Sequence, residues 1–399
     1  MKNKGVSLEK VLSFATYFLA YLLFSIPGIG KMLSKKNKKI VGFAFDYFSG
    51  NIKYLYQEMK NYPEIEAYFV TTIKKEAEKL RLSGVNAYYY RDVKRIPLFL
   101  KTDVWVTSHG PNFIPFRGIR RVIPFYKGKR HSKWVDVWHA VEVKDVGREK
   151  MLTEYDLGFV TSEFFKQHYS SKESRISDKL KITGDARTDP LIKKNWDKEK
   201  ILKEIGIPSD KKSILYAPTW GHGKKKAFLP WRATDKNLED VEKFCEKNNC
   251  NFLIRMHPLW YGRNPEERKK LDEKVKQSEN IFDLSVEKYP EVQRILYITD
   301  VLITDWSSIA NDFILLDNPI IFIDAEVPVQ ELISKPEDRA GYVIRNKEEF
   351  FEKLQESLDN PNLFEKKRKM VRKKLYKYLD GNSSKRCAKE IIKLVKKSH

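Results

Sequence analysis

The sequence has little cysteine: three residues in 399, Cys245, Cys250 and Cys387. They form no CxxC pair, so we expect neither a disulfide framework nor a zinc site, and the thiols suit a reducing compartment. The GxxxxGK[ST] phosphate loop, the GxGxxG fingerprint, the GxSxG elbow and the DxD acidic pair are all missing. Their absence argues against the nucleotide-binding and hydrolase sites that these motifs build, and we expect no metal and no cofactor.

Composition and charge indicate a globular protein with anionic partners. A chain of 399 residues with 41% hydrophobic residues is typical of a globular protein of about two domains. The formal net charge of +22 predicts anionic partners, such as phospholipid, nucleotide or phosphate polymer. The lysines are spread along the chain and are not interleaved with aromatic residues in one module. This pattern argues against a protein that binds nucleic acid.

The N-terminal residues 11–30 carry no charged residue and have lysines on both sides. A signal peptide, a transmembrane helix and a helix in the membrane plane are all compatible with such a run. Pro27-Gly28 makes a poor cleavage region, and the apolar residues gather mostly on one helical face. We therefore assign residues 1–38 to a membrane-associating helix on an anionic surface, with a span as the alternative. If residues 11–30 span the membrane, the denser lysines after this run place the rest of the chain in the cytoplasm.

From residue 39 the pattern alternates between short apolar strands and helices, which is typical of βαβ units. The predicted strands are 40–45, 66–71, 87–90, 104–108, 134–138, 157–161 and 181–183, then 213–216, 252–256, 301–304 and 320–323. A polar stretch, 193–200, separates the two series. The fold class is therefore α/β, with Rossmann-like domains at 39–192 and 193–399 facing a cleft and a basic helical tail from about Phe364. In such sheets, ligands bind beyond the carboxyl ends of the strands.

Polar residues stand at four of these strand ends: His139, Thr219, His257 and the segment Asp305–Ser308. A single histidine at such a place is more often structural, but four polar endings could meet in one cleft. A neutral histidine can take a proton from a hydroxyl near pH 7. A second histidine can stabilise phosphate oxygens.

Asp305-Trp306-Ser307-Ser308 joins a buried strand to a predicted helix over 309–316. A helix start with serines favours a phosphate, and Asp305 could orient the serines or a sugar hydroxyl. The plain alternative is that one serine only caps the helix.

The segments WHAVEVKDVG, TGDARTD, ILYAPTW, RMHP, ITDWSSIANDF and DGNSSKR resemble, in this order, the CDP-glycerol:glycerophosphotransferase family of teichoic acid primases and polymerases. The resemblance covers roughly residues 40 to 390. It implies a GT-B fold and a peripheral enzyme on the cytoplasmic face of the membrane. It also implies transfer of glycerol phosphate or ribitol phosphate from a CDP-alditol to a polyprenyl-linked acceptor, with release of CMP.

The resemblance also implies roles for individual residues. Ala140 stands where the family has glycine, a change that would matter if that position needs a positive φ. By their position after His139, and apart from the resemblance, Glu142 or Asp145 could orient it, or both could simply be solvated. The predicted catalytic residues are His139, as the general base, and His257; the predicted substrate-binding residues are Lys144, Arg187, Thr219, Arg255, Asp305, Ser307 and Ser308. A GT-B glycosyltransferase that uses a nucleotide sugar stays open as the alternative.

Overall fold

The computed structural model describes residues 38–115, 132–219, 235–325 and 332–396, together with Ala15 and Leu19. The predicted membrane-associating segment lies almost wholly outside these ranges. Within them, no helix has both the length and the apolar character needed to cross a bilayer.

The N-terminal half is built on a parallel seven-stranded sheet of order β3-β2-β1-β4-β5-β6-β7. Val41 of β1 pairs with Ala67 of β2 on one side and with Val104 of β4 on the other. The strands are β1 (Lys39–Ala44), β2 (Ile65–Thr71), β3 (Ala87–Tyr89), β4 (Val104–Thr107), β5 (Lys133–Asp136), β6 (Leu157–Val160) and β7 (Leu180–Ile182). The helices are α3 (Gly50–Met59), α4 (Lys74–Leu82), α5 (Ile96–Leu100), α7 (Arg148–Leu152) and α8 (Glu163–Lys172).

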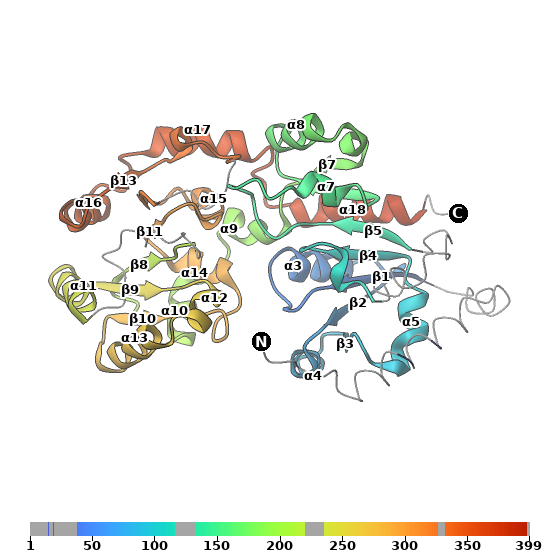
Figure 1. Cartoon of the computed structure of the whole chain (residues 1–399), viewed down its shortest axis with the longest axis horizontal. Coiled ribbons are helices and arrows are strands. Elements are labelled where there is room, and N and C mark those ends of the chain that lie inside the picture. The colour runs from blue at the N-terminus through green and yellow to red at the C-terminus, as the bar shows by residue number, and fades with distance from the viewer. Residues whose placement is uncertain are drawn as a thin grey trace, which may run out of the picture.

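The C-terminal half repeats this plan in a parallel six-stranded sheet of order β10-β9-β8-β11-β12-β13 (Figure 1). Its strands are β8 (Lys212–Tyr216), β9 (Cys250–Ile254), β10 (Ile281–Asp283), β11 (Val301–Thr304), β12 (Ile320–Ile323) and β13 (Tyr342–Ile344). The helices from the connection onward are α9 (Asp189–Lys193), α10 (Lys198–Glu204), α11 (Asp235–Asn248), α12 (Pro258–Arg263), α13 (Pro265–Gln277), α14 (Val292–Ile298), α15 (Ile309–Phe313), α16 (Lys347–Asp359), α17 (Glu365–Leu375) and α18 (Ser383–Lys396). In both halves the strand order reverses after the first strand, between β1 and β4 and between β8 and β11, as in a Rossmann sheet.

The eleven predicted strands are confirmed, with boundaries that differ by no more than two residues. Two strands were missed, β10 and β13, and each has only three residues. The predicted helix over 309–316 is divided into α15 and the 3-10 turn η5 (Ile314–Leu316), which ends at Asp317 with a φ of 65°.

Buried apolar side chains fill both faces of each sheet, as expected for parallel strands covered by helices. One buried cluster includes Val160 and Tyr169 of the N-terminal half and Leu215 and Leu302 of the C-terminal half. The hydrophobic core is therefore continuous between the halves on one side of the molecule.

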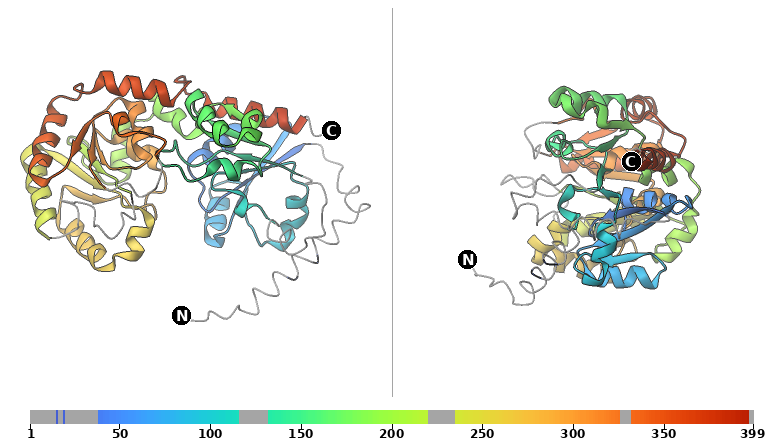
Figure 2. Two further views of the ribbon diagram at one scale, coloured as in Figure 1. Left: turned by 45° about the horizontal axis from the view of Figure 1, so that its top comes forward. Right: turned by 90° about the vertical axis from the view of Figure 1, so that its right-hand side faces the viewer.

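The end of the chain returns to the N-terminal half (Figure 2). Helix α18 packs on α3, and its apolar residues, including Cys387 and Ile391, join the core of the first sheet. Asp189 accepts hydrogen bonds from the backbone N–H groups of Ser383 and Ser384, each at 2.8 Å, and from the Ser384 hydroxyl at 2.7 Å. A carboxylate at the start of a helix satisfies its unpaired N–H groups. The DGNSSKR and TGDARTD segments are thus joined by a buried helix cap.

Candidate active site

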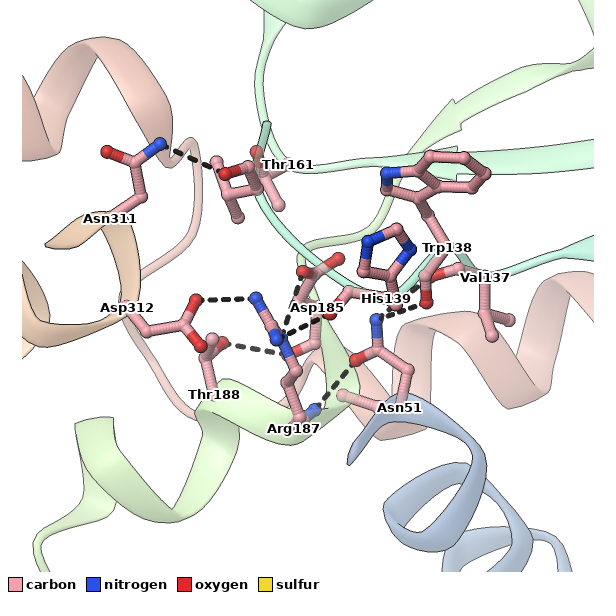
Figure 3. A network of polar contacts seen from close by, with 12 residues as sticks. Asn51, Val137, Trp138, His139, Thr161, Asp185, Arg187, Thr188, Asn311 and Asp312 are labelled. Atoms are coloured by element: carbon pink, nitrogen blue, oxygen red, sulfur yellow. Dashed lines mark hydrogen bonds and ion pairs between the residues drawn. The ribbon is translucent and has the colours of Figure 1, made fainter. Parts of the chain in front are cut away.

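His139 lies three residues beyond the end of β5, on a loop that Asn51 fixes from α3. The Asn51 amide donates to the carbonyl oxygens of Val137 at 2.8 Å and Trp138 at 3.1 Å (Figure 3). Trp138 has a φ of 46°, a left-handed conformation that non-glycine residues seldom adopt. Among the described residues, the positive φ in this loop falls at Trp138 and not at Ala140, so the alanine meets no such requirement.

Arg187 follows β7 and is almost completely buried. Its Nη1 donates to the carbonyl oxygen of His139 at 2.5 Å, and its Nη2 donates to Asp312 of α15 at 2.7 Å. Its Nε lies 3.6 Å from Asp185, and its backbone N–H donates to Asn51 at 2.9 Å. The guanidinium therefore joins the His139 loop to the C-terminal half (Figure 3).

Neither Glu142 nor Asp145 orients His139 through a hydrogen bond among the described residues. Glu142 is buried 3.8 Å from Arg148, and burial raises the pKa of its carboxyl to about 8. Asp145 contacts His168 at 2.9 Å and Lys172 at 2.6 Å. Although Glu142 and Asp145 closely follow His139 in the sequence, their carboxylates lie near other partners, namely Arg148, His168 and Lys172.

The surroundings of His139 favour its neutral form. His139 is partly exposed, and desolvation by the surrounding loops lowers the pKa of its imidazole well below the ordinary 6.5. The neighbouring His109 and Arg187 lower it further, while a backbone group of Ser108 opposes the shift. His139 can therefore accept a proton at neutral pH.

The N-terminal half is predicted to face the acceptor, and the C-terminal half is predicted to bind the CDP-alditol donor. The predicted donor side begins at the carboxyl ends of β8 and β11, the two strands where the order of the second sheet reverses. Asp305 accepts hydrogen bonds from the Thr219 backbone at 2.9 and 3.1 Å and from the Thr219 hydroxyl at 3.0 Å. Ser307 and Ser308 follow and are partly exposed. Ser308 is the residue before α15, and its side chain makes no capping hydrogen bond. No hydrogen bond therefore supports the alternative that Ser308 only caps the helix.

His257 and Lys144 come from different halves and are coupled electrostatically. His257 follows β9, and its Nδ1 accepts from the backbone N–H of Leu259 at 3.2 Å, which leaves the neutral ring with its proton on Nε2. Burial, and then the positive charge of Lys144, lowers the pKa of His257 to about 4. Burial also lowers the pKa of Lys144, and Asp305 raises it. These three residues therefore lie near one another.

Arg255 contacts the protein itself. Its Nη1 donates to the carbonyl oxygens of Leu284 at 2.7 Å and Tyr289 at 2.8 Å, and burial lowers its pKa to about 10. This arginine holds the loop after β10.

The segment between His139 and Asp145 crosses from one half to the other. The Val143 carbonyl accepts from the N–H groups of Ile333 at 2.9 Å and Ser334 at 3.2 Å, and Lys144 forms a β-bridge with Leu332. The side chain of Asn311 donates to the Val141 carbonyl at 3.0 Å. The chain that begins at the predicted base thus ends against the predicted donor residues.

A pocket lies where this crossing segment meets the second half. Val143, Asp305, Ser307 and Arg339 are among its lining residues. The guanidinium of Arg339 stacks on Trp306 at 3.6 Å and pairs with Asp324 at 3.0 Å. Its Nε and Nη2 have no hydrogen-bond partner among the described residues. Such buried donors suit a ligand or water that brings oxygen acceptors.

Several site residues were not identified from the sequence. His109 follows β4 just as His139 follows β5, so the rule of polar residues at strand ends could have found it. Asn51, Asp312 and Arg339 gave no such signal, because their roles depend on contacts with distant parts of the chain.

Comparisons with known proteins identify the family of this chain. The family model of CDP-Glycerol:Poly(glycerophosphate) glycerophosphotransferase matches residues 29–393. The chain is 28% identical to the teichoic acid ribitol-phosphate polymerase TarK of Staphylococcus aureus, over 94% of this chain and 72% of TarK. It is 25% identical to the teichoic acid glycerol-phosphate transferase of Staphylococcus aureus, over 91% of this chain and 95% of that protein.

A structure of a variant of the wall teichoic acid polymerase TagF has the same fold, with a TM-score of 0.73 and 19% identity over 98% of this chain and 99% of TagF. The two Rossmann-like halves are therefore GT-B-like, as the resemblance implied. The family model covers far more than half of the sequence, and the chain is an enzyme of the CDP-glycerol:poly(glycerophosphate) glycerophosphotransferase family.

Proposed function

We propose that this enzyme transfers glycerol phosphate or ribitol phosphate from a CDP-alditol to a polyprenyl-diphosphate-linked acceptor and releases CMP. The observation that supports this most is the segment from His139 to Lys144, which begins at a neutral histidine of one half and ends beside His257 and Asp305 of the other. Two substrates that meet between the halves would each face one end of this segment. TagF, which shares the fold, has been soaked with CDPG.

The proposed reaction is an in-line phosphoryl transfer. His139 accepts the proton of an acceptor hydroxyl, and that oxygen forms a bond to the phosphorus next to the alditol. The bond between this phosphorus and the bridging oxygen breaks, and CMP leaves. His257, through Nε2, together with Lys144, Ser307 and Ser308, stabilises the charge that builds on the diphosphate. Catalysis of this kind depends mainly on positioning and electrostatics.

Arg187, Arg255 and Thr219 are assigned indirect roles. The guanidinium groups of Arg187 and Arg255 contact carbonyl or carboxylate oxygens of the protein, and Thr219 contacts Asp305. We infer that they position His139, His257 and Asp305, in place of the direct substrate contacts expected from the sequence.

The test is release of nucleotide in the presence of a lipid-linked acceptor. We expect CMP from CDP-glycerol or CDP-ribitol, and no nucleoside diphosphate from a nucleotide sugar. Ser308→Ala should slow this release while changing the free energy of unfolding by less than about 1 kcal/mol, the usual cost of a lost cap. Release of UDP from a UDP-sugar, with no CMP, would instead establish a glycosyltransferase. Unchanged kinetics in a less stable Ser308→Ala protein would return this serine to a capping role.

We further propose that residues 1–38 dock the enzyme on an anionic membrane surface at the cytoplasmic face. The support is the uncharged run 11–30 between lysines. A protein of residues 39–399 should stay in the supernatant when vesicles containing phosphatidylglycerol are sedimented, while the full chain sediments with them. Complete sedimentation of the shortened protein would place the anchor elsewhere.

A further inference from the structure

The first sheet brings a residue next to His139 that the predicted site did not include. Its strand order reverses between β1 and β4, and the crevice outside such a reversal is where open α/β sheets bind ligands. Phe45 directly follows β1, and His109 follows β4 after one serine. In the second sheet, Thr219 and Asp305 follow the corresponding strands β8 and β11. Ser108 directly follows β4 as Asp305 directly follows β11, and His109 is the next residue.

Three rings from three loops form a stack at this crevice. The His109 ring lies 4.5 Å from the Phe45 ring at an interplanar angle of 10°. It lies 3.9 Å from the His139 ring at 20°. The hydroxyl of Ser108 lies 3.2 Å from Nδ1 of His109 and fixes the rotation of that ring. The His139 imidazole thus packs against the His109 ring, which in turn stacks on the ring of Phe45.

The charge state of His109 suits this contact. Burial, and then the charge of Arg187, lowers the pKa of His109 to about 4, so the ring is neutral near pH 7. When His139 takes a proton it becomes an imidazolium, and a neutral aromatic face stabilises a cation stacked on it. A second cation at 3.9 Å would repel it. Arg187 and Arg148 already disfavour the positive charge on His139, and a charged His109 would disfavour it further.

We propose that His109 is a positioning residue for phosphoryl transfer, which holds the His139 ring at the acceptor side through the stack with Phe45. This inference rests on the proposed function in one respect, namely that His139 is the base. It predicts that an aromatic ring at position 109 matters more than an imidazole nitrogen.

The experiment compares His109→Ala with His109→Phe, and His168→Ala is the control, because His168 pairs with Asp145 on another part of the half. CMP release, affinity for CDP-glycerol and Tm are measured for each. His109→Ala should lower kcat about 10- to 100-fold, the scale of a misplaced catalytic group. Its affinity for CDP-glycerol should stay within about twofold of wild type, because a positioning residue of the acceptor side does not contact the donor. His109→Phe should recover most of the loss, and His168→Ala should leave kcat unchanged.

A His109→Phe enzyme as slow as His109→Ala would overturn the proposal, since the imidazole would then act by its nitrogen atoms. Wild-type kcat in a folded His109→Ala enzyme would overturn it as well. The His139 ring protons give a second measurement that needs no turnover. Their NMR signals should carry the upfield shift of a stacked ring in wild type and His109→Phe, and should lose it in His109→Ala. Failure of CMP release in wild type with this shift present would count against the proposed function and leave the stack intact.

Discussion

Replacing His139 by alanine is expected to lower CMP release by about 100- to 10,000-fold, the usual contribution of a general base. The ring is neutral at pH 7, partly open to solvent and mounted on a loop that Asn51 and Arg187 hold in place. Because it stands in the half proposed to face the acceptor, its removal should leave the affinity for CDP-alditol nearly unchanged. Rates of CMP release, binding titrations and Tm on the purified variant measure these three quantities.

His257→Ala is the matched comparison, because His257 is a second neutral histidine after a strand but belongs to the half proposed to bind the donor. Its loss should weaken CDP-alditol binding as well as transfer. Near-normal turnover by a folded His139→Ala enzyme would remove His139 from the mechanism. A joint fall of Tm and donor affinity in His139→Ala would show that the residue packs the loop and is not the base.

Replacing Arg187 by methionine is expected to lower the free energy of unfolding by about 3 to 5 kcal/mol, the cost of removing one member of a buried ion pair. The substitution leaves Asp312 and Asp185 buried without their cation, and it releases the carbonyl of His139. Burial already raises the pKa of Asp312 to about 6 against the opposing charge of Arg187. Without that charge the carboxyl should become protonated, which limits the loss. Denaturant unfolding measures the difference.

Arg175→Met is the control for Arg187→Met, because Arg175 pairs with Glu173 at the surface and is 76% exposed. A surface pair contributes little, so we expect no resolvable change in the free energy of unfolding. The donor affinity of Arg187→Met, measured where both proteins are folded, separates two roles. Unchanged affinity with slower transfer fits a positioning residue. A large loss of CDP-alditol affinity in a protein of wild-type stability would restore the direct substrate contact expected from the sequence.

The part of the fold that could be predicted is the part that local pattern determines. Strands such as Val301–Thr304 and Ile320–Ile323 are continuous apolar runs because parallel strands are covered on both faces. The strand-end rule then marked His139, His257 and Asp305, because the carboxyl ends of parallel strands gather at one edge of a sheet. The short strands Ile281–Asp283 and Tyr342–Ile344 were missed, although the equally short Ala87–Tyr89 and Leu180–Ile182 were predicted, so length alone does not explain the misses.

The sequence by itself determined the two α/β halves, the strand-end residues and the family, because these depend on neighbouring residues and on motifs. Only the tertiary structure decided what each polar group contacts. It placed Arg187 between His139 and Asp312, turned Glu142 and Asp145 away from His139, and stacked His109 on it. It also returned α18 to the first half through Asp189. Several of these partners lie from 30 to nearly 200 positions apart in the sequence. The spacing of motifs carries no information on such pairs, because only the folding of the chain brings the residues together.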